Sequence, residues 1–337
     1  MKVTIADIAK AANVAKSTVS KVMNDSPKIS AETKARVRRI MEELNYIPNG
    51  IATGLARQSS CNIGLLIDMS KQDEFLNQFF YPIIGGIESV IGPLKYELTI
   101  SNVQSGPQGQ SVLNRLVLSK RVDGVIANSS VLNEELTEAL RRSGVPFLSI
   151  GEIGSPASWV DFDNELGGYT LTRHLLEQGY SKIAFIGGER LESIFSRRHA
   201  GYMRAMSEHG KLPLNTWTIN GQADEHTGYR TGLELLGAAE RPDAVVCMNN
   251  YAAFGLLRAA AELGVRIPQE LGVAAFDDYP LSRYTTPPLT ALHIDTFRLG
   301  VAAGELLMER ISGTPPHRQL LLVPELMIRD SSRRVLG

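Results

Sequence analysis

A short stretch near the start of the chain, residues 16–24 (KSTVSKVMN), gathers side chains that could bind an anion. Its apolar residues recur at helical spacing, which predicts a helix that buries Val19, Val22 and Met23. The polar side chains would point outward from that helix: Lys16, Ser17, Thr18, Ser20 and Lys21. Ammonium and hydroxyl groups donate hydrogen bonds, so we expect a polar, anionic partner to lie against this surface.

The distribution of charge agrees with an anionic partner for this part of the chain. Residues 1–60 contain ten Lys and Arg and five Asp and Glu, a net charge of +5. The remaining residues contain twenty-five basic and thirty-one acidic side chains, a net charge of −6, so the total is −1. A basic head on an acidic body indicates a polyanion such as nucleic acid. A basic helix face that is merely solvated is the alternative.

Two further helical patterns would hold the basic helix in place. Thr4 and Asp7 form an N-capping pair before the first, and Asn13 after it tolerates the left-handed backbone of a tight turn. The third pattern starts at the cap Ser30. The apolar faces of these two helices are Ile5, Ile8, Ala9 and Ala12, and Val37, Ile40, Met41 and Leu44. The arrangement predicts an all-α helix-turn-helix head whose second helix enters the major groove of DNA. A small interaction bundle is the alternative.

From residue 62 onward, short apolar runs alternate with amphipathic helical stretches. The runs are NIGLLI, YELTI, DGVIA, PFLSI, KIAFIGG and AVVCM. Strands separated by helices predict parallel sheets with helices on both faces. The order recurs, once over about 62–155 and again over about 160–290, which predicts two similar α/β lobes facing each other.

Ligands of open parallel sheets bind beyond the carboxyl ends of the strands, here between the lobes. Phe79 follows the first strand, Asn249 follows AVVCM, and Asp277 follows GVAAF. Asn and Asp can each make two hydrogen bonds to adjacent hydroxyl groups, which suits a polyol. Two alternatives stay open. Phe79 could belong to the core, and Asp277 could cap a turn within the sequence DDYP.

The stretches TIADIAKAANVAKSTVSKVMN and ISAETKARVRRIMEELNYIPN resemble the head of the lactose/galactose repressor (LacI/GalR) family. The stretches SWVDFDNELGGYTLTRHLLEQGYSKIAFIGG and LGVAAFDDYPLSRYTTPPLTALHIDTFRLG are similar to that family's core, so the resemblance covers essentially the whole chain. It implies two lobes of the type I periplasmic-binding-protein-like fold. The implied domains are a head (1–47), a hinge (48–60) and an effector-binding and dimerisation core (61–337). Lobe 1 would take about 61–159 and 295–322, and lobe 2 about 160–292 and 324–333.

The resemblance also implies roles for individual residues toward DNA. Lys16, Ser17 and Lys21 would read bases, although the family usually has Arg at the last position and Ser where Ala15 stands. Lys lacks the planar two-donor fork with which Arg recognises guanine, so base readout there would be less stringent. Leu55, with Ala52, would enter the minor groove from a hinge helix that orders only on the operator. A plain linker is the alternative for this segment. The implied phosphate contacts are Thr4, Thr18, Ser20, Asn24, Lys28 and Ser30.

In the core, Arg198 matches the family's ligand-binding arginine, although its neighbour Arg197 leaves the register open by one residue. The implied effector residues are therefore Phe79, Arg198, Asn249 and Asp277. Gly151, Ala223 and Asn250 depart from the acid, the aromatic lid and the Asp found in some members. These departures predict a roomier, less anionic pocket. An oligosaccharide, a glycoside or a ligand that is not a sugar therefore stays open beside a simple sugar.

Other classes of protein fit the sequence poorly. A transport receptor would share the lobes, but the start MKVTIADIAK lacks the uninterrupted apolar core of a signal peptide, and no apolar run has membrane-spanning length. The two glycine motifs that bind phosphate groups, G-x-G-x-x-G and G-x-x-x-x-G-K-[ST], do not follow any of the predicted strands. We therefore expect no enzyme and no cofactor. Cys61 and Cys247 fit neither a disulfide framework nor a zinc site, and we expect no metal. A reducing cytoplasm is the expected location.

The sequence thus predicts a homodimeric, ligand-responsive transcription factor that binds palindromic operator DNA. We expect it to repress a carbohydrate-use operon, with repression relieved by a small sugar-like effector. A regulator whose ligand promotes DNA binding is the first alternative, and a solute-binding receptor is a more remote one.

Overall fold

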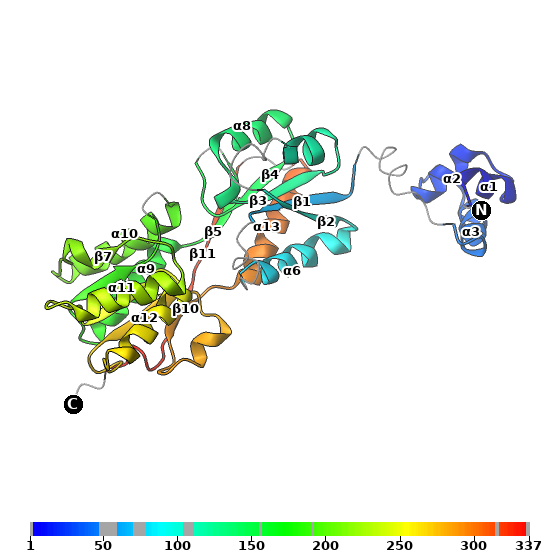
Figure 1. Cartoon of the computed structure of the whole chain (residues 1–337). Coiled ribbons are helices and arrows are strands. Elements are labelled where there is room, and N and C mark those ends of the chain that lie inside the picture. Colours follow the sequence, from blue (N-terminus) through cyan, green and yellow to red (C-terminus); the bar gives the residue numbers. More distant parts are fainter. Residues whose placement is uncertain are drawn as a thin grey trace.

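The structure is a computed structural model that describes residues 3–46, 59–69, 79–103, 111–154, 157–189, 192–313 and 317–334 (Figure 1). The N-terminal part is a three-helix head formed by α1 (Ile5–Ala11), α2 (Lys16–Met23) and α3 (Ala31–Glu43). Its buried residues come from all three helices: Ile8, Ala9, Ala12, Val19, Val22, Val37 and Ile40. The expected helix-turn-helix head is therefore present.

Local hydrogen bonds explain where the helices of the head begin and end. The Asp7 carboxylate accepts hydrogen bonds from the backbone N–H (2.9 Å) and the hydroxyl (2.7 Å) of Thr4 at the start of α1. Asn13 adopts a φ of 48° in the turn that follows. The Ser30 hydroxyl oxygen accepts from the backbone N–H of Thr33 and caps α3. Helix α2 ends at Met23, so Asn24 is its C-cap rather than its last helical residue.

The first lobe is built around a six-stranded sheet in the order β11-β5-β4-β3-β1-β2, in which all neighbouring strands are parallel. Helices α6 (Phe80–Ile91) and α13 (Thr296–Ile311) cover one face, and α8 (Glu134–Ser143) and a π-helical segment (Leu113–Leu118) cover the other. The strands are β1 (Asn62–Ile67), β2 (Glu97–Asn102), β3 (Gly124–Asn128), β4 (Phe147–Ile150), β5 (Trp159–Phe162) and β11 (Gln319–Leu322).

The second lobe repeats this plan with the strand order β12-β10-β9-β8-β6-β7. Helices α9 (Asn164–Glu177) and α10 (Ser193–Glu208) cover one face, and α11 (Glu225–Gly237) and α12 (Asn250–Glu262) cover the other. The strands are β6 (Ile183–Ile186), β7 (Thr218–Ile219), β8 (Ala244–Cys247), β9 (Gly272–Phe276), β10 (Thr290–His293) and β12 (Glu325–Met327). Strand β12 runs antiparallel to β10, which the repeated pattern did not predict. Short helical turns lie at Gly92–Leu94, Ser129–Val131, Asn215–Trp217 and Pro280–Arg283.

The chain passes between the two sheets three times (Figure 1). It leaves the first sheet after β5 for α9, returns after β10 to α13, and leaves again between β11 and β12. Because β5 pairs with β11 as far as Phe162, the first passage begins after Phe162, three residues beyond the expected end of lobe 1 near residue 159. The region where the two lobes meet therefore lies at the carboxyl ends of the parallel strands: β1, β3 and β4 of the first lobe, and β6, β8 and β9 of the second.

Candidate nucleic-acid interface and ligand site

Helix α2 presents the predicted base-reading residues on its outer surface. Lys16, Ser17 and Lys21 are exposed, whereas Val19 and Val22 are completely buried beneath them. No side chain caps the start of α2, because its N-cap residue is Ala15. The outer surface of α2 therefore offers exposed donor groups, as the predicted groove-binding helix requires.

The six predicted phosphate contacts differ in their surroundings. Thr4, Lys28 and Ser30 are exposed, and Thr18, Ser20 and Asn24 are half-buried. Thr4 donates its hydroxyl to Asp7, and Ser30 donates its own to the Thr33 hydroxyl at 2.9 Å. These two hydroxyls would have to reorient before donating to a phosphate. Leu55 and Ala52 lie outside the described residues.

In the core, α10 carries the predicted ligand arginine, and its guanidinium is surrounded by protein. Arg198 is 5% exposed, and its guanidinium lies 3.9 Å from the centroid of the Phe276 ring. Its Nε donates to the Asn164 side-chain oxygen at 2.9 Å, and its Nη1 donates to the Met248 carbonyl at 2.5 Å. Burial lowers the pKa of Arg198, an effect that the nearby Asp277 carboxylate partly offsets. Of the two neighbouring arginines, it is thus Arg198 that lies in this buried cluster beside Asp277.

Asp277 lies at the end of β9 with its carboxylate toward Arg198. Its Oδ1 is 3.7 Å from Arg198 Nη2 and has no hydrogen-bond partner among the described residues. Burial raises the pKa of Asp277, and the Arg198 charge works against that rise. The backbone of Asp277 has a φ of 69°, a left-handed conformation that Asp tolerates better than most residues. A buried carboxylate oxygen with unused capacity indicates a place for a ligand's hydrogen-bond donor.

Asn249 is placed beside this pair but is already engaged. It is the N-cap of α12, where its Oδ1 accepts from the backbone N–H of Ala252 at 2.9 Å. Its Nδ2 donates to the Ala223 carbonyl at 2.6 Å. One amide proton and one oxygen lone pair are left for a ligand, so its contribution is smaller than that of Asp277.

Phe79 belongs to the first lobe and is half-buried. It packs against that lobe's core and makes an edge-to-face contact with Phe80, with ring centroids 5.3 Å apart. Its described contacts are with first-lobe residues, whereas Arg198 and Asp277 contact each other in the second lobe. Stacking of Phe79 on a ligand therefore remains a prediction, and packing in the core is what the structure supports.

The structure adds two features of the site that the sequence analysis did not contain. Asn164 lies two residues after the end of β5, as Asn249 does after the end of β8, so the strand-end rule that selected Asn249 also applies to it. Gly151, which stands about where some family members have an acid, has a φ of 99°, and a Cβ on it would lie 2.2 Å from the Ser129 hydroxyl oxygen. A side chain at residue 151 is thus disfavoured by the backbone and by Ser129.

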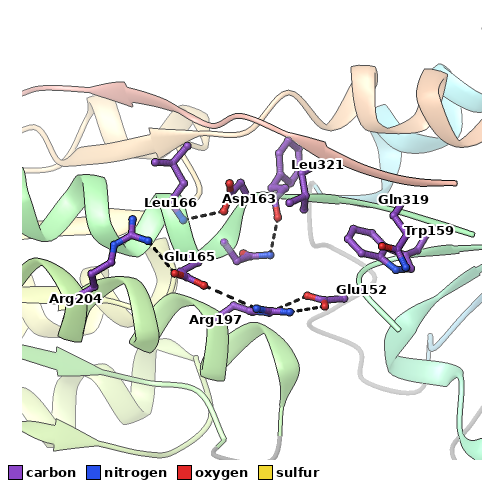
Figure 2. Close-up of a pocket in the computed structure, with 11 residues that line it drawn as sticks. Glu152, Trp159, Asp163, Glu165, Leu166, Arg197, Arg204, Gln319 and Leu321 are labelled. Carbon is purple, nitrogen blue, oxygen red and sulfur yellow. Dashed lines mark hydrogen bonds and ion pairs between the residues drawn. The ribbon is translucent and has the colours of Figure 1, made fainter. Parts of the chain in front are cut away.

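Arg197 pairs with Glu152 of the first lobe, as Figure 2 shows. Within the described parts of the chain, no group of His, Cys, Asp and Glu side chains has a metal-binding arrangement. No helix among those same residues is long and apolar enough to span a membrane.

Comparisons with known proteins place the chain in a family. Residues 4–49 match the bacterial regulatory proteins of the lacI family, and residues 172–332 match the periplasmic binding protein-like domain. The chain is 33% identical over 336 residues to the HTH-type transcriptional repressor PurR of Vibrio vulnificus (strain CMCP6), covering 98% of this chain and 99% of that protein. The chain belongs to the lacI family. The predicted family and the two-lobed fold are confirmed.

Solved structures of lacI-family members agree along almost the whole chain. The lac repressor dimer bound to operator and the anti-inducer ONPF matches with a TM-score of 0.85 at 28% identity, covering 98% of this chain and 99% of that one. The complex of the transcriptional regulator CelR with cellobiose matches with a TM-score of 0.75 at the same identity and coverage. As a lacI-family repressor, the chain is a DNA-binding regulator and not an enzyme.

Proposed function

We propose that this lacI-family repressor acts as a cytoplasmic homodimer on a palindromic operator, and that a polyhydroxyl effector of the sugar type relieves repression. The observation that carries the effector class is the Arg198–Asp277 pair. Arg198 is a buried donor, and the Asp277 Oδ1 lies 3.7 Å from it without a hydrogen-bond partner among the described residues. A donor and an acceptor at this spacing suit the neighbouring hydroxyl groups of a sugar. The cellobiose complex of CelR supports the same class.

For DNA, we propose that Lys16, Ser17 and Lys21 read bases. Leu55 and Ala52 would enter the minor groove. The head would be positioned on the DNA by the six predicted phosphate contacts: Thr4, Thr18, Ser20, Asn24, Lys28 and Ser30. The exposure of the three base-reading side chains on α2 supports this assignment. Contacts to phosphate fix the orientation of a protein on the duplex, whereas contacts to base edges select the sequence.

We infer the sign of the response from the placement of the lobes. At equal identity and coverage, the chain matches the operator-bound lac repressor better than the cellobiose complex of CelR, with TM-scores of 0.85 and 0.75. We therefore propose that the described placement is the one that binds operator. An effector that binds another placement more tightly would then release DNA. A ligand that favours the described placement would instead act as a co-repressor.

The first test identifies the operator. Duplexes selected from a randomised library by the full-length chain should share a palindromic site, and gel shifts should measure its affinity at several salt concentrations. Lys21→Arg should sharpen the preference at one base pair by about 1–3 kcal/mol if it gains a two-donor contact to guanine. The assignment of α2 fails if Lys16→Ala and Lys21→Arg both select the same sequences as the unchanged chain.

The second test identifies the effector by thermal shift against monosaccharides, disaccharides, glycosides and purine bases. Asp277→Asn should weaken binding of the hit by about ten- to a hundred-fold, since a hydrogen bond to a charged acceptor contributes about 1.5–3 kcal/mol. Glu177→Gln, on the exposed surface of the same lobe, is the matched control. A purine base as the only hit would reject the sugar class, and unchanged affinity in Asp277→Asn would reject the site.

Binding of the two ligands must be reciprocal. The hit should weaken operator binding by the same factor by which the operator duplex weakens binding of the hit. A hit that tightens the operator complex would show that the protein is a co-repressor-type regulator and that our sign is wrong.

A further inference from the structure

A two-donor ion pair joins the two lobes beside the ligand site. Glu152 follows β4 of the first lobe, and Arg197 lies on α10 of the second. Arg197 Nε donates to Glu152 Oε2 at 2.9 Å, and its Nη2 donates to Oε1 at 2.5 Å. The pair lies in a cavity of about 450 Å³ whose lining comes from both lobes and does not include Arg198 or Asp277 (Figure 2). It is thus separate from the Arg198–Asp277 pair.

The first-lobe partner is held in place by β5. The Asp161 carboxylate accepts the backbone N–H of Glu152 at 3.0 Å and that of Phe162 at 2.7 Å. Phe162 is the last residue of β5, where the chain crosses to the second lobe. The position of Glu152 is therefore tied to the crossing itself.

The second-lobe partner adjoins the ligand arginine. Arg197 and Arg198 are consecutive residues of α10, one directed toward Glu152 and the other buried against Phe276. Asn164 contacts both the cavity that holds the Glu152–Arg197 pair and the buried site around Arg198. It lines the cavity, and its side-chain oxygen accepts the hydrogen bond from Arg198 Nε. A movement of α10 that improves the contact of Arg198 with a ligand must therefore also move Arg197 relative to Glu152.

We propose that the Glu152–Arg197 pair is a latch between the lobes, which stabilises the operator-binding placement and opens when an effector engages Arg198. The proposal rests on the function proposed above. The two side chains are 28% and 49% exposed, so water screens the pair and its contribution is modest. Partly exposed pairs contribute about 0.2–1 kcal/mol, which corresponds to about 1.5- to 5-fold in operator affinity per protomer.

A matched pair within one lobe provides the control. Arg258 on α12 and Glu225 on α11 are 3.2 Å apart, are also exposed, and join two helices of the second lobe only. Glu165 is unsuitable as a control residue, because it contacts Arg197 (3.8 Å) as well as Arg204 (2.9 Å). A double-mutant cycle on each pair separates the pairwise interaction from the effects of the single substitutions.

The first measurement is the distance between the lobes. Spin labels at exposed positions of the two lobes (Arg142→Cys and Lys211→Cys, with Cys61→Ser and Cys247→Ala) report it in the full chain by electron–electron double resonance. Glu152→Ala and Arg197→Ala should each shift or broaden the distance distribution, and the double variant should resemble either single one. Glu225→Ala and Arg258→Ala should leave it unchanged. An unchanged distribution in Glu152→Ala, or equal changes in both cycles, would overturn the latch.

The second measurement is affinity for the duplex that the unchanged chain selects from a randomised library. Glu152→Ala and Arg197→Ala should each lower operator affinity by about 1.5- to 5-fold per protomer, non-additively, and the loss should shrink at high salt. Additive losses, or equal losses in the Glu225–Arg258 cycle, would contradict the latch. If the unchanged chain selects no duplex, the proposed function fails, while the distance measurement still decides whether the pair holds the lobes.

Discussion

At the scale of single residues, a buried histidine links the C-terminal segment to the second lobe. His174 on α9 is 4% exposed, and its Nε2 lies 2.7 Å from the Ser332 hydroxyl oxygen. The Ser332 hydroxyl in turn lies 2.7 Å from that of Thr290 on β10. Burial lowers the pKa of His174, so the neutral ring is favoured in the folded chain. These contacts give His174 a structural role.

The lowered pKa predicts a pH dependence of stability. At a pH below about 6.5, the pKa of histidine in the unfolded chain, His174 binds a proton in the unfolded chain but stays neutral in the folded chain. The free energy of unfolding should therefore fall as the pH drops from 6.5 toward the folded pKa, by up to about 1.4 kcal/mol at pH 5.5. Urea unfolding at pH 7.5 and 5.5 measures this loss. It should shrink in His174→Gln and persist in His226→Gln, a substitution at an exposed histidine of α11. Equal losses in all three proteins would contradict the assignment.

At the scale of elements, pairs of helices approach backbone to backbone at glycines. Helices α9 and α10 meet at Gly168 and Gly201, where an added Cβ would lie 2.0 Å from the Arg198 carbonyl oxygen and 1.9 Å from that of Glu165. Gly228 and Gly255 play the same part between α11 and α12, as do Gly86 and Gly300 between α6 and α13. The approach of α9 to α10 is what brings Asn164 within 2.9 Å of Arg198.

This packing makes Gly201→Ala costly. The added methyl group meets backbone, which cannot rotate away, so α9 and α10 must separate. Overpacking of this kind costs about 1–3 kcal/mol of unfolding free energy or more. Gly237→Ala, an exposed position of α11 with no atom within 4 Å of the added Cβ, should be neutral or stabilising by up to about 1 kcal/mol. Thermal unfolding compares the two, and a Tm for Gly201→Ala at or above that of Gly237→Ala would show that the helices can move apart freely.

At the scale of the whole molecule, each lobe has one aspartate whose carboxylate accepts hydrogen bonds from the backbone N–H groups just before the lobe's first strand. The Asp123 carboxylate, just before β3, accepts from the backbone N–H groups of Ser60 (2.7 Å) and Cys61 (3.0 Å) and from the Ser59 and Ser60 hydroxyls. Asp243, just before β8, likewise accepts from the backbone N–H groups of Ser181 and Lys182. Burial alone would raise the pKa of Asp123, but the hydrogen bonds outweigh it and the pKa lies below its ordinary value. Only Asp123 binds the end of the expected hinge (48–60), through Ser59 and Ser60, together with Cys61, the first residue after it.

The repeat supplies its own control for a test of how the head is connected to the core. Asp123→Asn and Asp243→Asn each remove a charged acceptor and should each cost about 1.5–3 kcal/mol of unfolding free energy. Only Asp123→Asn should also weaken binding to the selected operator duplex, because it loosens the connection to the hinge. Gel shifts and urea unfolding of both variants measure the two effects. If both variants bind the duplex like the unchanged chain, Asp123 serves the stability of its lobe alone.

The sequence by itself determined the features that arise within a few residues of the chain. The cap of Thr4 and Asp7, the turn at Asn13 and the buried face of α2 follow from side-chain spacing. The alternation of strands and helices likewise predicted two sheets covered on both faces, since apolar periodicity reports local burial.

Only the tertiary structure decided what depends on residues far apart in the sequence. Spacing could not show which of Arg197 and Arg198 faces Asp277. Consecutive residues of a helix point about 100° apart, and the side of α10 that faces β9 is set by the packing of the second lobe, not by the local sequence. Nor could spacing show the pairing of β12 with β10, or the ion pair between Glu152 and Arg197. Each of these contacts joins segments separated by more than thirty residues, and the packing of whole helices and sheets fixes them rather than any local preference.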